Sequence, residues 1–206
     1  RYYNIYPFIP EVETERKERY KEIIKIQALG LARRLKHTGL KKCVLGISGG
    51  VDSTLVFLIV IEADRKLGIT NDNLIGITMP GFGTTGRTYN NALSLMEKYG
   101  VTVREVSIKD ACIQHFKDIG LDENDRSVTY ENSQARERTQ ILMDIANQEG
   151  AFVVGTGDLS ELILGWCTYN GDHMSMYCVN GGVPKTLVRH LVGYYAEIEE
   201  NEDCKK

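Results

Sequence analysis

The sequence lacks an excess of charge of either sign, a long apolar run and any signal-peptide pattern. Its 206 residues carry 25 Lys and Arg against 28 Asp and Glu, so the charge balance does not indicate a nucleic-acid-binding protein. No apolar run reaches the roughly 18 residues that span a bilayer. The chain starts at Arg1 without an initiator Met, which favours a piece of a longer protein. We expect that protein to be cytoplasmic.

The sequence also lacks paired cysteines. The count is odd and no CxxC occurs, so neither a disulfide framework nor a zinc ribbon is indicated. Unreactive thiols in a reducing cytosol are the preferred interpretation. They are Cys43, Cys112, Cys167, Cys178 and Cys204.

Short apolar runs alternate with segments of helical periodicity, which predicts one α/β domain with a parallel sheet and helices on both faces. We expect strands at 43–47, 74–79, 102–107 and 151–154. We expect helices at 14–36, 54–67, 88–99, 110–119, 131–148 and 187–198. Residues 1–13 contain two prolines, which indicates an extended segment before the first helix. We expect that helix to end at Gly39.

Three glycine-containing loops follow predicted strands, at 48–53, 80–87 and 155–158. In a parallel sheet such loops converge at the carboxyl ends of the strands, where ligands of α/β proteins bind. We therefore expect the ligand site at this edge.

The first of these loops has the features of a phosphate site. Its two glycines allow positive φ and close approach of a ligand, and the following helix offers free N–H groups and a positive dipole end. A Walker loop would carry a Lys, whereas this loop carries Asp52, which would repel a bare phosphate. A bound Mg²⁺ resolves the conflict. The alternative is that Asp52 or Ser53 merely caps the helix.

The complete string Ser-Gly-Gly-x-Asp-Ser at 48–53 resembles the PP-loop of the ATP pyrophosphatase superfamily, which implies an adenine-nucleotide alpha-hydrolase-like (Rossmann-like) fold. The later motifs resemble NAD synthetases, above all the synthetase part of the large glutamine-dependent bacterial form. These motifs are Met79–Thr85, Glu131–Arg136, Gly155–Glu161 with Leu164–Tyr169, and Asn180–Thr186.

This resemblance implies ATP-dependent amidation of deamido-NAD (nicotinic acid adenine dinucleotide) to NAD through an adenylate, with release of AMP and pyrophosphate. Mg²⁺ would be held by Asp52 and Glu161, and the catalytic residues would be Asp52 and Lys185. The implied ATP contacts are Gly46, Ile47, Ser48, Gly49, Gly50, Val51, Asp52, Ser53 and Thr156. The implied deamido-NAD contacts are Asn132, Glu161, Trp166, Cys167, Thr168 and Tyr169.

Several of these residues have simpler interpretations. Trp166 and Tyr169 could be core aromatics, although a stacking surface is favoured for the Trp. Asp158 is better interpreted as a helix N-cap than as a ligand. The roles of Arg136, Arg138 and the two histidines His173 and His190 stay open. A thiolating enzyme, another synthetase of the superfamily or a non-catalytic nucleotide-binding module are the weaker alternatives.

The resemblance also implies parts that this sequence does not contain. We expect residues 1–206 to be a synthetase domain truncated at its C-terminus, since the tail Glu197–Lys206 stops short of a segment with a dinucleotide-contacting lysine. A nitrilase-like glutaminase domain would precede it and supply ammonia from glutamine. The resemblance further implies a homodimer or higher assembly. Whether the piece is active by itself stays open.

Overall fold

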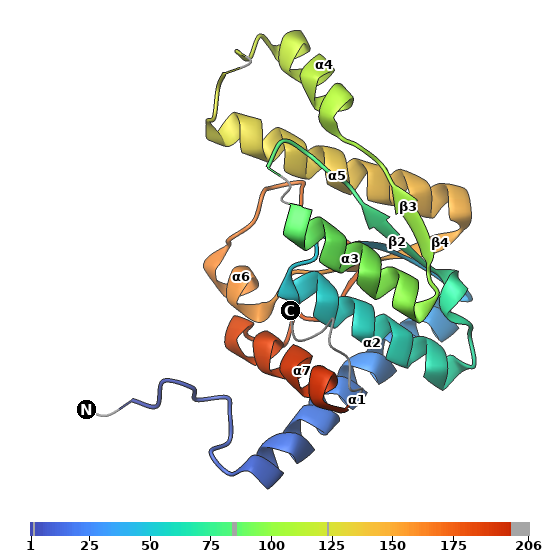
Figure 1. Ribbon diagram of the computed structural model, residues 1–206, viewed down its shortest axis with the longest axis vertical. Helices are drawn as coiled ribbons and strands as arrows, with labels where there is room; N and C mark the ends of the chain where they lie inside the picture. Colours follow the sequence, from blue (N-terminus) through green and yellow to red (C-terminus); the bar gives the residue numbers. More distant parts are fainter. Residues whose placement is uncertain (2, 84–85, 123, 199–206) are drawn as a thin grey trace.

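The computed structural model describes residues 1, 3–83, 86–122 and 124–198. Its strands form one five-stranded sheet in the order β3-β2-β1-β4-β5, and every neighbouring pair is parallel. The predicted α/β class is therefore confirmed (Figure 1). The strands are β1 (Lys42–Gly46), β2 (Leu74–Thr78), β3 (Thr102–Glu105), β4 (Ala151–Gly155) and β5 (Tyr177–Cys178).

Seven α-helices and one short 3-10 helix accompany the sheet in the described residues. The α-helices are α1 (Glu13–Thr38), α2 (Val51–Leu67), α3 (Gly86–Tyr99), α4 (Lys109–Ile119), α5 (Val128–Glu149), α6 (Leu159–Leu164) and α7 (Lys185–Ile198), and η1 (Asn71–Asn73) precedes β2. The predicted stop after the first helix is confirmed, because Gly39 caps α1 in the left-handed conformation at φ 75°. None of the helices in these ranges is long and apolar enough to cross a membrane.

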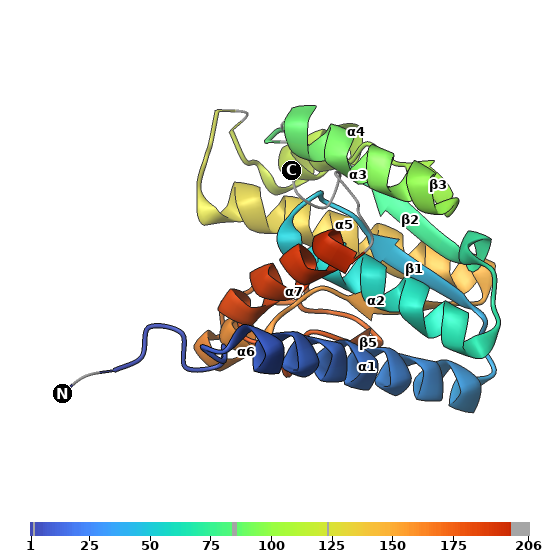
Figure 2. The same cartoon turned by 60° about the horizontal axis from the view of Figure 1, so that its bottom comes forward.

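The three central strands β1, β2 and β4 are buried on both faces of the sheet, as their continuous apolar runs require. Along β1, Cys43 and Leu45 belong to the core under α1, α2, α3 and α7, whereas Val44 points into the core under α5. Figure 2 shows α1, α2 and α7 side by side on one face of the sheet, and α4 packs on α5 on the other side.

The position of β1 decides where a ligand can bind. β1 pairs with β2 on one side, with Cys43 beside Leu74, and with β4 on the other, with Lys42 beside Ala151. The chain turns in opposite directions from these strands, so a topological switch point lies between the ends of β1 and β4. The predicted loops after these two strands therefore face each other.

The sequence pattern misses three short elements. The 3-10 helix η1 has three residues, the strand β5 has two and the helix α6 has six, and none is long enough to show a period. Boundaries also shift: α5 begins at Val128 because the Ser127 side chain caps it, accepting the N–H of Thr129, and β3 ends at Glu105. Three of the predicted features, Thr84 and Thr85 of the second loop and most of the acidic tail, lie outside the described residues.

One buried acid stands out in the core. Asp64 of α2 is 1% exposed, and neither of its carboxyl oxygens has a hydrogen-bond partner in the part of the chain that the structure describes. Burial raises the pKa of Asp64 to about 7. An unfolded Asp titrates near ~3.9, so the neutral form is the one that the fold accommodates.

We expect Asp64 to make the free energy of unfolding fall as the pH rises. Because the folded-state pKa lies above the unfolded one, the contribution of Asp64 is complete below about pH 4 and is lost as the pH rises through about 7. Relative to Asp64→Asn, the wild type should lose up to about 4 kcal/mol across that window. Urea unfolding of both proteins at a series of pH values measures the difference, and a difference that does not change with pH would contradict the assignment.

Candidate functional site

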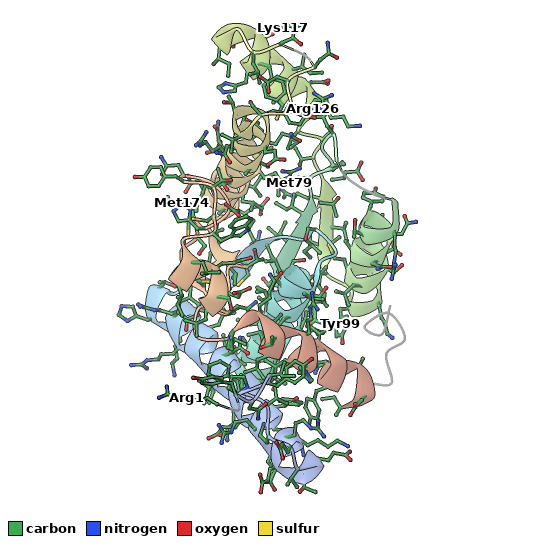
Figure 3. All side chains as sticks on the ribbon, turned by 90° about the vertical axis from the view of Figure 1, so that its left-hand side faces the viewer. Arg1, Met79, Tyr99, Lys117, Arg126 and Met174 are labelled. Carbon is green, nitrogen blue, oxygen red and sulfur yellow. The ribbon has the colours of Figure 1, made fainter. Side chains whose placement is uncertain are left out.

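A cleft of about 1090 Å³ opens at the carboxyl ends of the strands, where the sequence predicted a site. Its walls come from the loops after β1, β2 and β4, from one side of α5 and from the segment after α6. Three of its lining residues, Met79, Arg126 and Met174, are labelled in Figure 3, below Lys117 at the top of the view and above Arg1.

The loop after β1 turns sharply at Gly49. This residue has φ +78°, and a Cβ there would lie 2.0 Å from the carbonyl oxygen of Thr88 in α3. Only glycine accepts both the left-handed conformation and this close approach. Gly50 has φ −83° and serves as the N-cap residue of α2, so the predicted positive φ applies to the first glycine of the pair.

The N-terminus of α2 faces the cleft without a side-chain cap. Ser48 and Ser53 instead hold the loop together: Ser48 Oγ accepts from Gly50 N at 3.2 Å, and Ser53 Oγ donates to Gly50 O at 3.0 Å. The idea that Asp52 or Ser53 acts as the cap of α2 is therefore wrong. Uncapped N–H groups at a helix start provide donors and a positive dipole end for an oxyanion.

Lys185, the first residue of α7, joins three carboxylates at the floor of this region. Its Nζ lies 2.7 Å from Asp52 Oδ2, 3.1 Å from Asp158 Oδ2 and 3.2 Å from Glu161 Oε1. Burial by itself would lower the pKa of Lys185, but hydrogen bonds to the carboxylates, that to Asp52 foremost, raise the pKa above its ordinary value. The structure thus brings together the residues predicted as metal ligands and as catalytic lysine.

The donors fit a magnesium ion held jointly with phosphate oxygens. Asp52 Oδ1 is buried and has no hydrogen-bond partner in the described ranges, so a ligating oxygen is free there. The same ranges contain no group of three or more Asp, Glu, His or Cys residues that could hold a metal without help. Mg²⁺ is usually bound by one or two carboxylates, with substrate phosphates and waters as its other ligands.

Asp158 and Glu161 are oriented by a capping box at the start of α6. Asp158 Oδ1 accepts from Glu161 N at 3.0 Å, and Asp158 N donates to Glu161 Oε2 at 3.1 Å. The interpretation of Asp158 as an N-cap is confirmed.

The backbone of Asp52 is held by a buried side chain that does not line the cleft. Asn180, which is fully buried, donates from Nδ2 to Asp52 O at 3.4 Å. Gln27 of α1 in turn donates to Asn180 Oδ1 and to the Val179 carbonyl, each at 3.0 Å. A polar chain therefore runs from the first helix to the metal-binding candidate.

The segment after α6 forms the other wall. Trp166 is 76% exposed and lines the cleft together with Cys167, so the Trp is not a core aromatic. Behind them Thr168 Oγ1 donates to Asn132 Oδ1 at 2.9 Å, and Arg136 Nε donates to the carbonyl of Tyr169 at 3.0 Å. Tyr169, 75% exposed, stacks on His173.

Most predicted contacts line the cleft, and some do not. The lining includes Gly46, Ile47, Ser48, Gly50, Asp52, Ser53, Thr156, Glu161, Trp166 and Cys167. Gly49 and Val51 shape the loop behind this surface, Asn132, Thr168 and Tyr169 support the wall, and Lys185 reaches the site through its ion pairs.

Arg138 of α5 is the main lining residue to which the sequence assigned no role. Its Nε donates to Met79 O at 3.4 Å, and no carboxylate forms an ion pair with it among the described residues. Burial lowers the pKa of Arg138, since a partly buried cation without an acid is disfavoured. The lining residues Gln134, Arg138 and Leu142 recur every four positions, a helical spacing that could have marked this face.

An uncapped helix start at a switch point, with carboxylates and a lysine beside it, is a site of the kind that binds phosphate groups in α/β proteins. The model of the NAD synthase family matches residues 23–200, and the chain belongs to this family. The predicted resemblance is thereby confirmed.

The relatives differ in length from this chain. The glutamine-dependent NAD(+) synthetase of Mycobacterium leprae is 42% identical over 206 residues, which cover 96% of this chain and 30% of that protein. The NH(3)-dependent NAD(+) synthetase of Fusobacterium nucleatum is 32% identical, over 86% of this chain and 64% of that one. This chain therefore spans about a third of the length of its glutamine-dependent relative in M. leprae.

A solved structure shows the same fold. The glutamine-dependent NAD+ synthetase of Acinetobacter baumannii, determined in complex with ADP, superimposes with a TM-score of 0.83 at 28% identity, over 95% of this chain and 35% of that chain.

Replacement of Gly49 should disrupt the loop more than replacement of its neighbour. In Gly49→Ala the new methyl group meets the Thr88 carbonyl and forces a strained φ, which should lower the free energy of unfolding by about 2 kcal/mol or more. The matched control Gly50→Ala keeps an allowed φ and should stay within about 1 kcal/mol of the wild type. Urea denaturation measures both, and equal effects would show that the approach of α3 does not constrain the loop.

Proposed function

We propose that this chain is the ATP-binding synthetase domain of a glutamine-dependent NAD synthetase, which amidates deamido-NAD to NAD. The observation that carries the proposal is the convergence of Asp52, Glu161 and Lys185 beside the uncapped start of α2. Family membership supports the same reaction.

The nucleotide is proposed to lie with its β and γ phosphates on the loop Gly46–Ser53. The N–H groups at the start of α2 and the hydroxyls of Ser48 and Ser53 would donate to the phosphate oxygens. Thr156 lies across the switch point on the β4 loop and lines the same space, so it is proposed as a further ATP contact.

Bound Mg²⁺ would neutralise charge on the leaving pyrophosphate, with Asp52 and Glu161 as its protein ligands. Asp52 offers the unpartnered buried Oδ1, and Glu161 faces the cleft through a carboxylate that the capping box orients. Lys185 adds a positive charge at the same place. These three residues would bind and orient the triphosphate so that its α phosphorus stays accessible from the other wall.

We propose two chemical steps for this site. The nicotinate carboxylate attacks the α phosphorus, the bond to the bridging oxygen breaks, and pyrophosphate leaves with that oxygen's electron pair. Ammonia then attacks the activated acyl carbon, AMP departs, and one proton of the nitrogen is released. Electrostatic stabilisation of the departing oxyanions is the main contribution of the protein to such reactions.

Deamido-NAD is proposed to lie against the wall formed by Trp166 and Cys167, which Thr168, Tyr169 and Asn132 support from behind. An exposed indole offers a stacking surface for a planar base or pyridine ring. Arg138, a cleft-lining cation without an acid, adds a contact for the dinucleotide's phosphates.

The source of ammonia and the oligomeric state both involve protein parts other than this chain. We propose that a glutaminase domain supplies ammonia, because the glutamine-dependent relative in M. leprae is more than three times as long as the matched region. We also propose a homodimer or a higher homo-oligomer. The exposed apolar side chains of Leu162, Ile163 and Leu164 next to Trp166 agree with a covered surface there.

The test of the reaction supplies Mg²⁺, ATP and an ammonium salt with one candidate acceptor at a time. Deamido-NAD should yield NAD, AMP and pyrophosphate in equal amounts, measured by chromatography and a pyrophosphate assay. Xanthosine monophosphate and aspartate, acceptors of related synthetases, should give none. Release of ADP, or turnover only with another acceptor, would refute the proposal.

Asp52 should be essential for the metal-dependent step. Asp52→Asn keeps the shape of the side chain but removes the charge that places the metal, so kcat/KM should fall by about 100-fold or more. Activity measured as a function of Mg²⁺ concentration separates a weaker metal site from misfolding, which circular dichroism would detect. Near-normal turnover would exclude Asp52 as a metal ligand.

A further inference from the structure

Asp158 differs from the other two carboxylates that contact Lys185. The side chains of Asp52 and Glu161 are 24% and 32% exposed, whereas that of Asp158 is 0% exposed. Asp52 and Glu161 line the cleft, and Asp158 does not. A ligand in the cleft can therefore approach the first two acids but not the third.

The contacts of Asp158 hold two site residues at once. One oxygen, Oδ1, accepts the backbone N–H of Glu161 and so fixes the start of α6. The other, Oδ2, has Lys185 Nζ at 3.1 Å and no hydrogen-bond partner otherwise in the described part of the chain. The α7 end that carries the lysine is fixed to the same turn, because Lys185 N donates to Ser160 Oγ at 3.1 Å.

Lys185 cannot keep its ion pairs with all three carboxylates when substrate is bound. On the proposed function, on which this inference rests, Asp52 and Glu161 turn to the metal, and the ammonium is needed by the phosphates. An ammonium group has three protons, so it can keep one buried acceptor while it donates to phosphate oxygens. Asp158 is the acceptor that remains, because no ligand reaches it.

We propose that Asp158 is a positioning residue that keeps the Lys185 ammonium in the cleft while the lysine passes from Asp52 and Glu161 to the leaving pyrophosphate. Without Asp158, the long lysine side chain would lose its fixed direction and regain rotamer freedom. Asp158 acts through Lys185 and touches no substrate itself.

Binding of magnesium pyrophosphate tests this inference without turnover. Asp158→Asn retains a side chain that caps helices well but removes the charge that holds Lys185. We expect it to weaken pyrophosphate binding by about 10-fold or more in calorimetry. A purely electrostatic effect has the opposite sign, since removal of a negative charge near an anion should tighten binding.

Two comparisons separate positioning from other effects. In the Lys185→Met background, Asp158→Asn should cause no further loss, because contacting residues that act together are not additive. The charge-matched control is Asp172→Asn, which removes an acid of the same cleft that accepts from Thr168 N and makes no ion pair with Lys185. Its pyrophosphate affinity should be unchanged or slightly tighter.

The outcomes distinguish this inference from the proposed function. Suppose that the wild type forms NAD and binds pyrophosphate. If Asp158→Asn then binds pyrophosphate equally well, or if it weakens binding also in the Lys185→Met background, the inference is overturned and the proposed function stands. If the wild type neither forms NAD nor binds pyrophosphate, the proposed function fails and takes the inference with it. The thermal unfolding midpoint of Asp158→Asn should stay within about 4 °C of that of the wild type. If Asp158→Asn does not fold, the variant Asp158→Ser, whose smaller side chain also caps helices, is used in its place.

Discussion

The sharing of one ammonium group by three carboxylates organises the site. Asp52 lies in the first turn of α2, Asp158 caps α6 with Glu161 in its first turn, and Lys185 begins α7, so one cation joins the N-terminal ends of three helices. Such a cluster contributes little net stability because each charge loses hydration, but loss of one member leaves the others uncompensated. The cost of dismantling it keeps the three helix starts facing the same space.

The parallel sheet explains why these helix starts meet. In the order β3-β2-β1-β4-β5, the chain leaves β1 and β4 at the same edge and in opposite directions. The cleft is thus a consequence of strand order, and the residues only decide what it binds. The loop after β1 offers donors for oxyanions, while the wall at Trp166 offers an aromatic surface, so two chemically different parts of a substrate pair can be bound side by side.

Local patterns in the sequence predicted the α/β fold and the edge of the sheet at which the cleft opens. Strand and helix periods indicated the α/β class, and the charge conflict at Asp52 led to the hypothesis of a bound metal. The N-cap interpretation of Asp158 was preferred from the sequence, and the structure shows the capping box that Asp158 forms with Glu161. The meeting of Glu161 with Lys185 came only through family resemblance, because no local rule relates residues 24 positions apart in different helices. The role of Arg138 stayed open, since a helical period alone does not tell a cleft from solvent.

The polar chain from Gln27 to Asn180 to Asp52 extends the site beyond its lining. Gln27 lies on α1 and is not one of the residues that line the cleft. Any shift of α1 along its axis would nevertheless be passed by two hydrogen bonds to the backbone of the metal-binding candidate. The first helix of the chain therefore helps to hold the start of α2, and its alignment affects the geometry of the helix end that faces the cleft.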